Sequence, residues 1–211
     1  TQPLPFTPFK DFTGRSINEI NLYSTEMSSA LCSIDRVSAS ANMNNRLSEA
    51  IVEAYKSTNG APISFELMLK CYQSRMKDAN NDDSISSVLK QLVNAHIFES
   101  EDKVSLIDDS YIIKMDGYPK DGPIAKAIVY FLMSKLNNIY ELLDKQAVND
   151  EVVQIRHFSI IDEAHYMLDF DNRPLRNLIA VGRNKGLSII LATQNTSSFK
   201  SKGFDFYANA Q

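Results

Sequence analysis

The sequence predicts an α/β chain that combines a small parallel sheet with a helical subdomain. Helical periodicity dominates for about eighty residues of the amino-terminal half. Farther along, two apolar runs of strand length are separated by a helix. Because these runs are apolar throughout, we expect a parallel sheet that is covered on both faces.

Composition sets limits on the class of protein. The 211 residues are 44% apolar and 23% charged, which is enough for one sizeable core or for a core with a helical subdomain. No apolar run approaches the roughly 20 residues of a membrane-spanning helix. The two cysteines, Cys32 and Cys71, lack disulfide or metal spacing, so we expect them to be reduced and the protein to be cytoplasmic. A net charge of -4 gives no general basic surface, so any contact with nucleic acid must be local or shared across an oligomer.

The first half is expected to form an extended lead-in over residues 1–14 and a helical subdomain over residues 15–98. Three prolines within the first twelve residues exclude a regular helix in the lead-in. Four amphipathic stretches follow it. The second ends at Asn59-Gly60, a strong helix stop, and Ser64 is suited to cap the third.

Residues 99–211 form the predicted sheet-containing core. Its expected order is two short β-prone runs, a long helix, a polar linker, a strand, a helix and a second strand. The corresponding ranges are 103–107, 111–115, 124–143, 144–150, 152–161, 174–181 and 187–192.

Two adjacent carboxylates, Asp162 and Glu163, follow the first of the two long strands. Open α/β sheets bind ligands at the carboxyl ends of their strands. One acid can lie beside Mg²⁺, usually through a water ligand, while the next orients or deprotonates an attacking water. Nucleotide hydrolysis uses this layout, although a strand can also end in Asp-Glu as a plain solvated turn.

Polar residues around the second long strand extend this pattern. Thr193-Gln194 follows the strand at the same rim, where Gln194 can contact a γ-phosphate or hold the water, or serve only as a polar cap. Arg183 lies before the strand, in a connection bracketed by Gly182 and Gly186. Its guanidinium can stabilise charge on a transferred phosphoryl group, including one bound to a neighbouring subunit, or it is part of a solvated loop.

The ordered set of motifs resembles the additional-strand P-loop motor ATPases of the HerA, FtsK and VirB4 group. The resemblance is carried by FSIIDEAH at 158–165, GRNKG at 182–186 and LATQ at 191–194. It maps the Walker B aspartate onto Asp162, the catalytic glutamate onto Glu163, the arginine finger onto Arg183 and the sensor glutamine onto Gln194. It implies ATP and Mg²⁺ as cofactors.

The resemblance also implies a fold and a biological role. The fold is a partial RecA-like core of a P-loop NTPase with an inserted helical subdomain. The role is an ATP-driven DNA translocase or helicase of HerA type, a hexameric ring in bacterial DNA defence or processing. Within the group, the long helical insertion is most similar to the DptH-like component of phosphorothioation-dependent DNA restriction, which implies nuclease or restriction partners. A VirB4-like secretion ATPase is the alternative motor.

The phosphate cradle of this group has no counterpart in the sequence. The motif G-x-x-x-x-G-K-[ST] is absent, and the nearest string, 117–126, has Pro123 in place of the lysine. Together with the first residue, Thr1, this leads us to expect the carboxyl-side part of a larger ATPase, inactive alone. The alternative is a scaffold or regulatory module that has no cradle and does not hydrolyse ATP.

Other chemically active residues have structural interpretations of at least equal weight. His165 can couple nucleotide state to the next loop, or simply satisfy a loop edge. His96 and His157 have no partners at metal spacing and are expected to be structural. Lys200 and Lys202, flanked by phenylalanines, can form a DNA-contacting loop or an ordinary surface.

Overall fold

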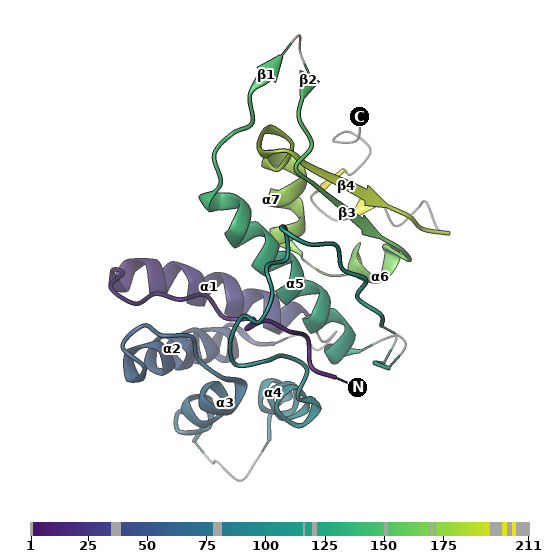
Figure 1. The fold of residues 1–211 in the computed structure, drawn as a ribbon. Helices are drawn as coiled ribbons and strands as arrows, with labels where there is room; N and C mark the ends of the chain where they lie inside the picture. Colours follow the sequence, from purple (N-terminus) through teal and green to yellow (C-terminus); the bar gives the residue numbers. More distant parts are fainter. Residues whose placement is uncertain are drawn as a thin grey trace. The chain divides into compact units, whose positions relative to one another are not determined.

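A computed structural model describes the chain, which is mostly helical and contains a small parallel sheet (Figure 1). The description covers residues 2–34, 39–77, 82–115, 117–119, 122–149, 152–168, 170, 172–194, 200–201 and 204–205. The chain divides into two compact units, residues 1–104 with 114–128 and residues 105–113 with 129–211.

The helices and strands follow one another along the chain as Figure 1 labels them. The helices are α1 (Ile17–Ile34), α2 (Ala41–Ser57), α3 (Phe65–Gln73), α4 (Ser84–Ala95), α5 (Pro123–Leu142), α6 (His165–Leu168), α7 (Arg173–Val181) and the 3₁₀ helix η1 (Arg183–Lys185). The strands are β1 (Val148–Asn149), β2 (Val152–Val153), β3 (His157–Ile161), β4 (Leu187–Leu191), β5 (Lys200–Ser201) and β6 (Phe204–Asp205). Among the described residues, no helix is both long and apolar enough to cross a bilayer.

In the first unit, α1 packs on α2, α2 packs on α3, and α3 packs on α4. Their ends agree with the local signals in the sequence. The Ser64 side chain accepts a hydrogen bond from the backbone of Leu67 at the start of α3, so the predicted cap is confirmed. The predicted stop at Asn59-Gly60 is also confirmed, since both residues have positive φ and the Gly60 amide closes the end of α2 on Tyr55.

The extended segment before α1 belongs to this same helical unit. Phe6, Phe9 and Phe12 are almost fully buried, and Leu4 forms a parallel bridge with Phe98, just beyond α4. Burial of these aromatic side chains fixes this proline-rich segment, which cannot form a helix, to the helical unit. The structural units therefore divide the chain at places other than the sequence-based boundaries after residues 14 and 98.

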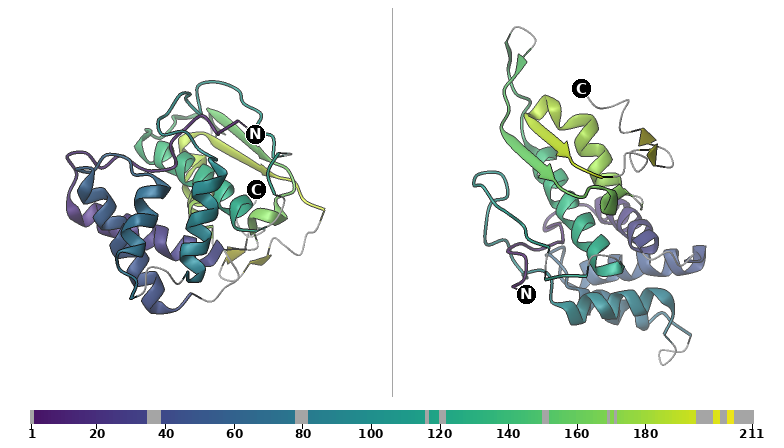
Figure 2. Two further views of the ribbon diagram at one scale, coloured as in Figure 1. Left: turned by 90° about the horizontal axis from the view of Figure 1, so that it is seen from below. Right: turned by 90° about the vertical axis from the view of Figure 1, so that its right-hand side faces the viewer.

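In the second unit, β3 and β4 pair in parallel, with His157 opposite Leu187 and Ile161 opposite Leu191 (Figures 1 and 2). Parallel pairing of these two strands is as predicted. Coverage on both faces was a wrong expectation for the described chain, because Phe158 is 55% exposed and Ile160 70% exposed. The two side chains lie on one face of the pair, since they are two residues apart in one strand. The described chain covers only the opposite face.

Other strand predictions were wrong in detail. Residues 103–107 and 111–115 form no strand. The Ser105 hydroxyl donates instead to the Asp108 carboxylate and the Tyr111 hydroxyl to Asp109, local bonds that compete with sheet pairing. The strand expected over 152–161 is divided into β2 and β3, and β2 pairs antiparallel with β1 in the segment expected to be a linker.

His157 is stacked on Tyr140 of α5, with ring centroids 6.4 Å apart and planes 18° from parallel. Burial lowers the pKa of His157 below its usual 6.5. The unfolded chain therefore binds a proton at this position more readily, and we expect the free energy of unfolding to decrease as the pH falls through and below about 6.5. In urea titrations, His157→Phe should keep the ring contact and lose less stability on acidification than the wild type. Equal acid sensitivity of the two proteins would contradict this role for His157.

Candidate functional site

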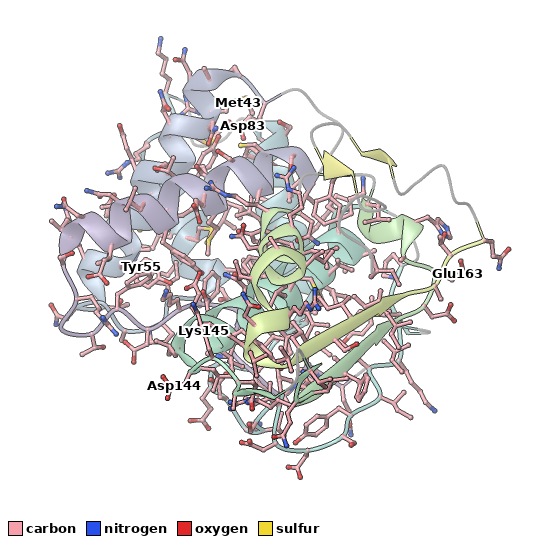
Figure 3. All side chains as sticks on the ribbon, turned by 90° about the horizontal axis from the view of Figure 1, so that it is seen from above. Met43, Tyr55, Asp83, Asp144, Lys145 and Glu163 are labelled. Atoms are coloured by element: carbon pink, nitrogen blue, oxygen red, sulfur yellow. The ribbon has the colours of Figure 1, made fainter. Side chains whose placement is uncertain are left out.

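The carboxyl ends of β3 and β4 are held together by backbone hydrogen bonds that continue beyond the strands. The amide of Ala192 donates to the carbonyl of Ile161 at 2.9 Å, and the amide of Ala164 donates back to the carbonyl of Ala192 at 2.8 Å. These bonds tie the turn that carries Glu163, labelled in Figure 3, to the segment that carries Gln194. The juxtaposition follows from parallel pairing, which brings both strand ends to one edge.

Polar groups contact both oxygens of the Glu163 carboxylate. The Gln194 side-chain amide donates to Oε1 at 2.7 Å, and Nδ1 of His165 lies 3.2 Å from Oε2. The Thr193 hydroxyl lies 3.3 Å from the same histidine nitrogen. Glu163 also has a φ of +51°, which is uncommon for a residue with a side chain. These contacts and the tight turn give the carboxylate a defined orientation, while 37% of the side chain stays exposed.

Asp162 lies beside Glu163 and is exposed. Its Oδ1 accepts a hydrogen bond from the Glu163 amide at 2.9 Å, which fixes the carboxylate against its own turn. In the part of the chain that the structure describes, no three His, Cys, Asp or Glu side chains gather as a metal cage. One exposed carboxylate nevertheless fits Mg²⁺, which is commonly bound by one or two carboxylates together with water and substrate phosphates.

This arrangement could act chemically as a general base next to a carboxylate that can bind a metal ion. The partly exposed Glu163 carboxylate at the sheet edge can accept a proton from a water within hydrogen-bond reach. The Gln194 amide offers both a donor and an acceptor, so it can hold Glu163 and a phosphate oxygen or water in turn. The structure thus brings together three of the four predicted site residues: Asp162, Glu163 and Gln194.

Arg183 lies at the other end of the strand pair. It belongs to η1, which precedes β4, whereas Gln194 follows β4. Five strand residues at about 3.3 Å each separate the two ends by roughly 16 Å. The Arg183 side chain is exposed and has no hydrogen bond or ion pair with any residue that the structure describes. One chain therefore does not bring Arg183 to its own Glu163.

His165 and Thr193 contribute more to this cluster than their sequence context predicts. Both contact the Glu163 cluster, directly or through each other. A signal was present, since His165 is two residues beyond Glu163 and Thr193 immediately precedes Gln194. Residues this close in sequence to two side chains that meet at a sheet edge share that edge with them.

The remaining sequence candidates contribute nothing further to this site. His96 adopts the left-handed conformation that ends α4, consistent with its structural interpretation. Cys32 and Cys71 are free thiols, and burial raises the pKa of Cys32 to about 11. Of the loop near the tail, Lys200 lies in β5, whereas Lys202 lies outside the described residues. Pro123, in the string nearest to a phosphate cradle, begins α5.

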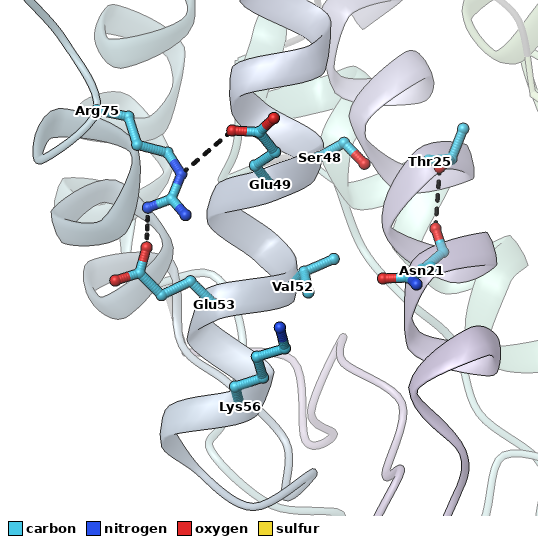
Figure 4. A pocket seen from close by; sticks show the side chains of 8 residues that line it. All are labelled: Asn21, Thr25, Ser48, Glu49, Val52, Glu53, Lys56 and Arg75. Atoms are coloured by element: carbon cyan, nitrogen blue, oxygen red, sulfur yellow. Dashed lines mark hydrogen bonds and ion pairs between the residues drawn. The ribbon is translucent and has the colours of Figure 1, made fainter.

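The helical unit contains a separate pocket of about 450 Å³ between α1 and α2 (Figure 4). Arg75 forms ion pairs at its rim with Glu53 and, at 3.6 Å, with Glu49. Lys56 and uncharged side chains complete the lining. Two acids face two bases here, so the pocket has no strong preference for a charged ligand, and it contains none of the predicted site residues.

Comparisons with known proteins reveal a similarity in fold. No protein-family model matches the sequence, and no curated protein matches it. Among solved structures, VirB4 of Thermoanaerobacter pseudethanolicus matches with a TM-score of 0.61 at 17% sequence identity. The match covers 97% of this chain and 57% of the VirB4 chain, and nothing in the comparisons supports the narrower likeness to DptH-like components. The described architecture, helices with a small parallel sheet, is therefore similar in fold to a part of VirB4.

Proposed function

We propose that this chain is part of an ATP-driven P-loop motor with a RecA-like core, of the type formed by HerA, FtsK and VirB4. In this proposal Glu163 is the catalytic base, Asp162 binds Mg²⁺, Gln194 senses the γ-phosphate and Arg183 is an arginine finger. The motor assembles as a hexameric ring in the cytoplasm. Its load is duplex DNA, in defence or processing together with nuclease or restriction subunits.

The contact between Gln194 and Glu163 is the observation that carries the proposal. The two residues are 31 apart in the sequence, yet their side chains meet at 2.7 Å beyond adjacent parallel strands. A plain solvated turn at the end of β3 has no need for a polar residue from the next strand. A hydrolytic site does need one, because the base must be aligned on the water and must respond to the phosphate. The fold similarity to VirB4 supports the same class.

The residues have separate tasks in the proposed reaction. Bound Mg²⁺ supplies charge neutralisation on the phosphates, and Asp162 holds the metal side of the site. Glu163 accepts the proton of the attacking water. The contacts with Gln194 and His165 keep its carboxylate aimed along the sheet edge. Arg183, exposed at the opposite end of the strands, serves the nucleotide of a neighbouring subunit.

A secretion motor is the second candidate function. The fold similarity to VirB4 favours it, because secretion ATPases of the VirB4 type drive substrate export. The ATP-hydrolysing residues are the same in both candidates, and only the load differs. A protein pump has no reason to respond strongly to duplex DNA.

The decisive experiment has two steps. The gene is first sequenced upstream of the Thr1 codon and searched for G-x-x-x-x-G-K-[ST]. The ATPase activity of the complete natural gene product is then assayed. We expect the motif, Mg²⁺-dependent hydrolysis that EDTA abolishes, and stimulation by duplex DNA. DNA that binds the active state of a motor more tightly shifts the motor toward that state. Hydrolysis without a DNA response would favour the secretion motor. A gene product without the motif that binds no ATP would overturn both candidates in favour of a scaffold.

A further inference from the structure

Arg183 lies in the short connection between α7 and β4, residues 182–186. A side-chain contact attaches this connection to α5. Lys185, the last residue of η1, donates hydrogen bonds through Nζ to the backbone carbonyls of Tyr140 at 2.6 Å and Glu141 at 2.9 Å. Both carbonyls belong to the final turn of α5. The last four carbonyls of a helix lack donors within the helix, so Lys185 satisfies two of them.

The positive charge of Lys185 suits the end of the helix that it contacts. The carboxyl end of a helix carries partial negative charge, and a lysine ammonium there is favourably placed. An uncharged or shorter side chain at position 185 cannot both reach these carbonyls and complement the helix dipole. The contact joins residues 45 positions apart, so it fixes η1 against an element far away in the sequence.

Backbone hydrogen bonds also hold the residues on either side of Lys185. The carbonyl of Asn184 accepts from the amide of Gln146 at 2.9 Å, and the carbonyl of Gly186 accepts from the amide of Arg156 at 2.7 Å. Gly186 has a φ of +82°, and a Cβ there would lie 2.7 Å from the carbonyl oxygen of Gln154. The backbone is therefore held on both sides of Lys185. Of the three η1 side chains, only that of Lys185 forms hydrogen bonds with residues that the structure describes.

We infer that Lys185 is a positioning residue for Arg183. It anchors the short helix to the end of α5, so that the exposed guanidinium two residues earlier is presented in one direction. This inference rests on the proposed function, in which Arg183 acts on a nucleotide outside its own site. Such a residue must be held by its own subunit before the partner's phosphate arrives, because ordering it during the reaction would add to the barrier.

The test compares Lys185→Met, Lys185→Arg and the matched control Lys145→Met in the complete gene product. Lys145 is exposed and lies in the segment after α5 (Figure 3). A misplacement of about 1 Å costs on the order of 100-fold in rate, so we expect Lys185→Met to lower kcat by about 10- to 100-fold with little change in the KM for ATP. Lys185→Arg keeps the charge and the donors and should retain most activity, and Lys145→Met should behave as the wild type.

Mixed oligomers separate a positioning defect from a general one. A Lys185→Met subunit retains its own Glu163, and a Glu163→Gln subunit retains its own Lys185 and Arg183. Mixing the two should restore hydrolysis at sites that combine the intact base with the intact arginine. Failure of this rescue, with Arg183→Ala and Glu163→Gln still complementing each other, would show that Lys185→Met damages its own subunit and would overturn the inference.

Two further outcomes distinguish failure of the inference from failure of the proposed function. Full activity of Lys185→Met beside an inactive Arg183→Ala overturns the inference alone, whereas full activity of Arg183→Ala overturns the proposed role of the arginine. Hydrogen exchange tests the anchor even in a protein without ATPase activity. Amides 182–187 should exchange faster in Lys185→Met than in Lys145→Met, and equal rates would overturn the inference.

Discussion

Replacing Glu163 with glutamine should abolish ATP turnover in the complete gene product while leaving ATP binding intact. The glutamine side chain has the same shape, and its carbonyl oxygen can still accept the hydrogen bond that Gln194 donates to Oε1 at 2.7 Å. It cannot accept a proton from water at neutral pH. General-base catalysis contributes about 10²- to 10⁴-fold, so the loss in kcat should lie in this range.

Two measurements on one protein check this expectation. Steady-state hydrolysis reports the loss of the base, and calorimetric titration with ATP and Mg²⁺ reports binding. Glu101→Gln is the matched control, because Glu101 is exposed, belongs to the other unit of the chain and undergoes the same change in charge and shape. Near-normal hydrolysis by Glu163→Gln would remove the catalytic role, and loss of ATP binding would indicate a metal ligand or a structural residue instead.

The contacts of His165 refine this prediction. Its Nδ1 lies 3.2 Å from Oε2 of Glu163 and 3.3 Å from the Thr193 hydroxyl. With glutamine at position 163 the negative charge beside the histidine is lost, but the bond from Gln194 remains. The variant should therefore keep the fold of the sheet edge, and an unchanged thermal unfolding midpoint is the accompanying expectation.

Local signals explain why the helical part could be predicted well from the sequence. The cap at Ser64 and the stop at Asn59-Gly60 depend on residues within a few positions of the helix end, and both are observed. The two β-prone runs show the opposite case. A strand needs a partner, and Tyr111, which is 42% exposed, has a local carboxylate partner instead. Strand formation depends on non-local pairing that propensity does not contain.

Part of the candidate site could likewise be predicted from the sequence, and part could not. Two neighbouring parallel strands have their carboxyl ends at the same edge of the sheet. The contact between Glu163 and Gln194 therefore follows from the predicted topology. The hydrogen bonds of Lys185 to the end of α5 do not follow from any pattern, because nothing in the sequence relates position 185 to position 140. The open face around Phe158 and Ile160 likewise could not be predicted, since an apolar run does not reveal which of its faces this chain covers.

Replacing Arg183 with alanine should stop turnover without changing the site that contains Glu163. The two residues lie at opposite ends of the β3–β4 pair, roughly 16 Å apart at about 3.3 Å per residue, so they cannot act on one phosphate within one chain. An arginine finger contributes about 10³- to 10⁵-fold to phosphoryl transfer, and a loss of this order is expected in kcat. ATP binding to the same subunit should persist, because its own metal and base side is intact.

Subunit mixing tests whether the arginine acts between chains. In an equal mixture of Arg183→Ala and Glu163→Gln, one interface in about four joins an intact base to an intact arginine if a ring with head-to-tail interfaces assembles at random. Hydrolysis should therefore recover to about a quarter of the wild-type rate if the sites fire independently. No recovery at any mixing ratio would contradict action in trans. Because Arg183 lies away from Glu163 of the same chain, that result would also exclude a catalytic role for Arg183. Its exposed guanidinium would then be assigned to contact with the load.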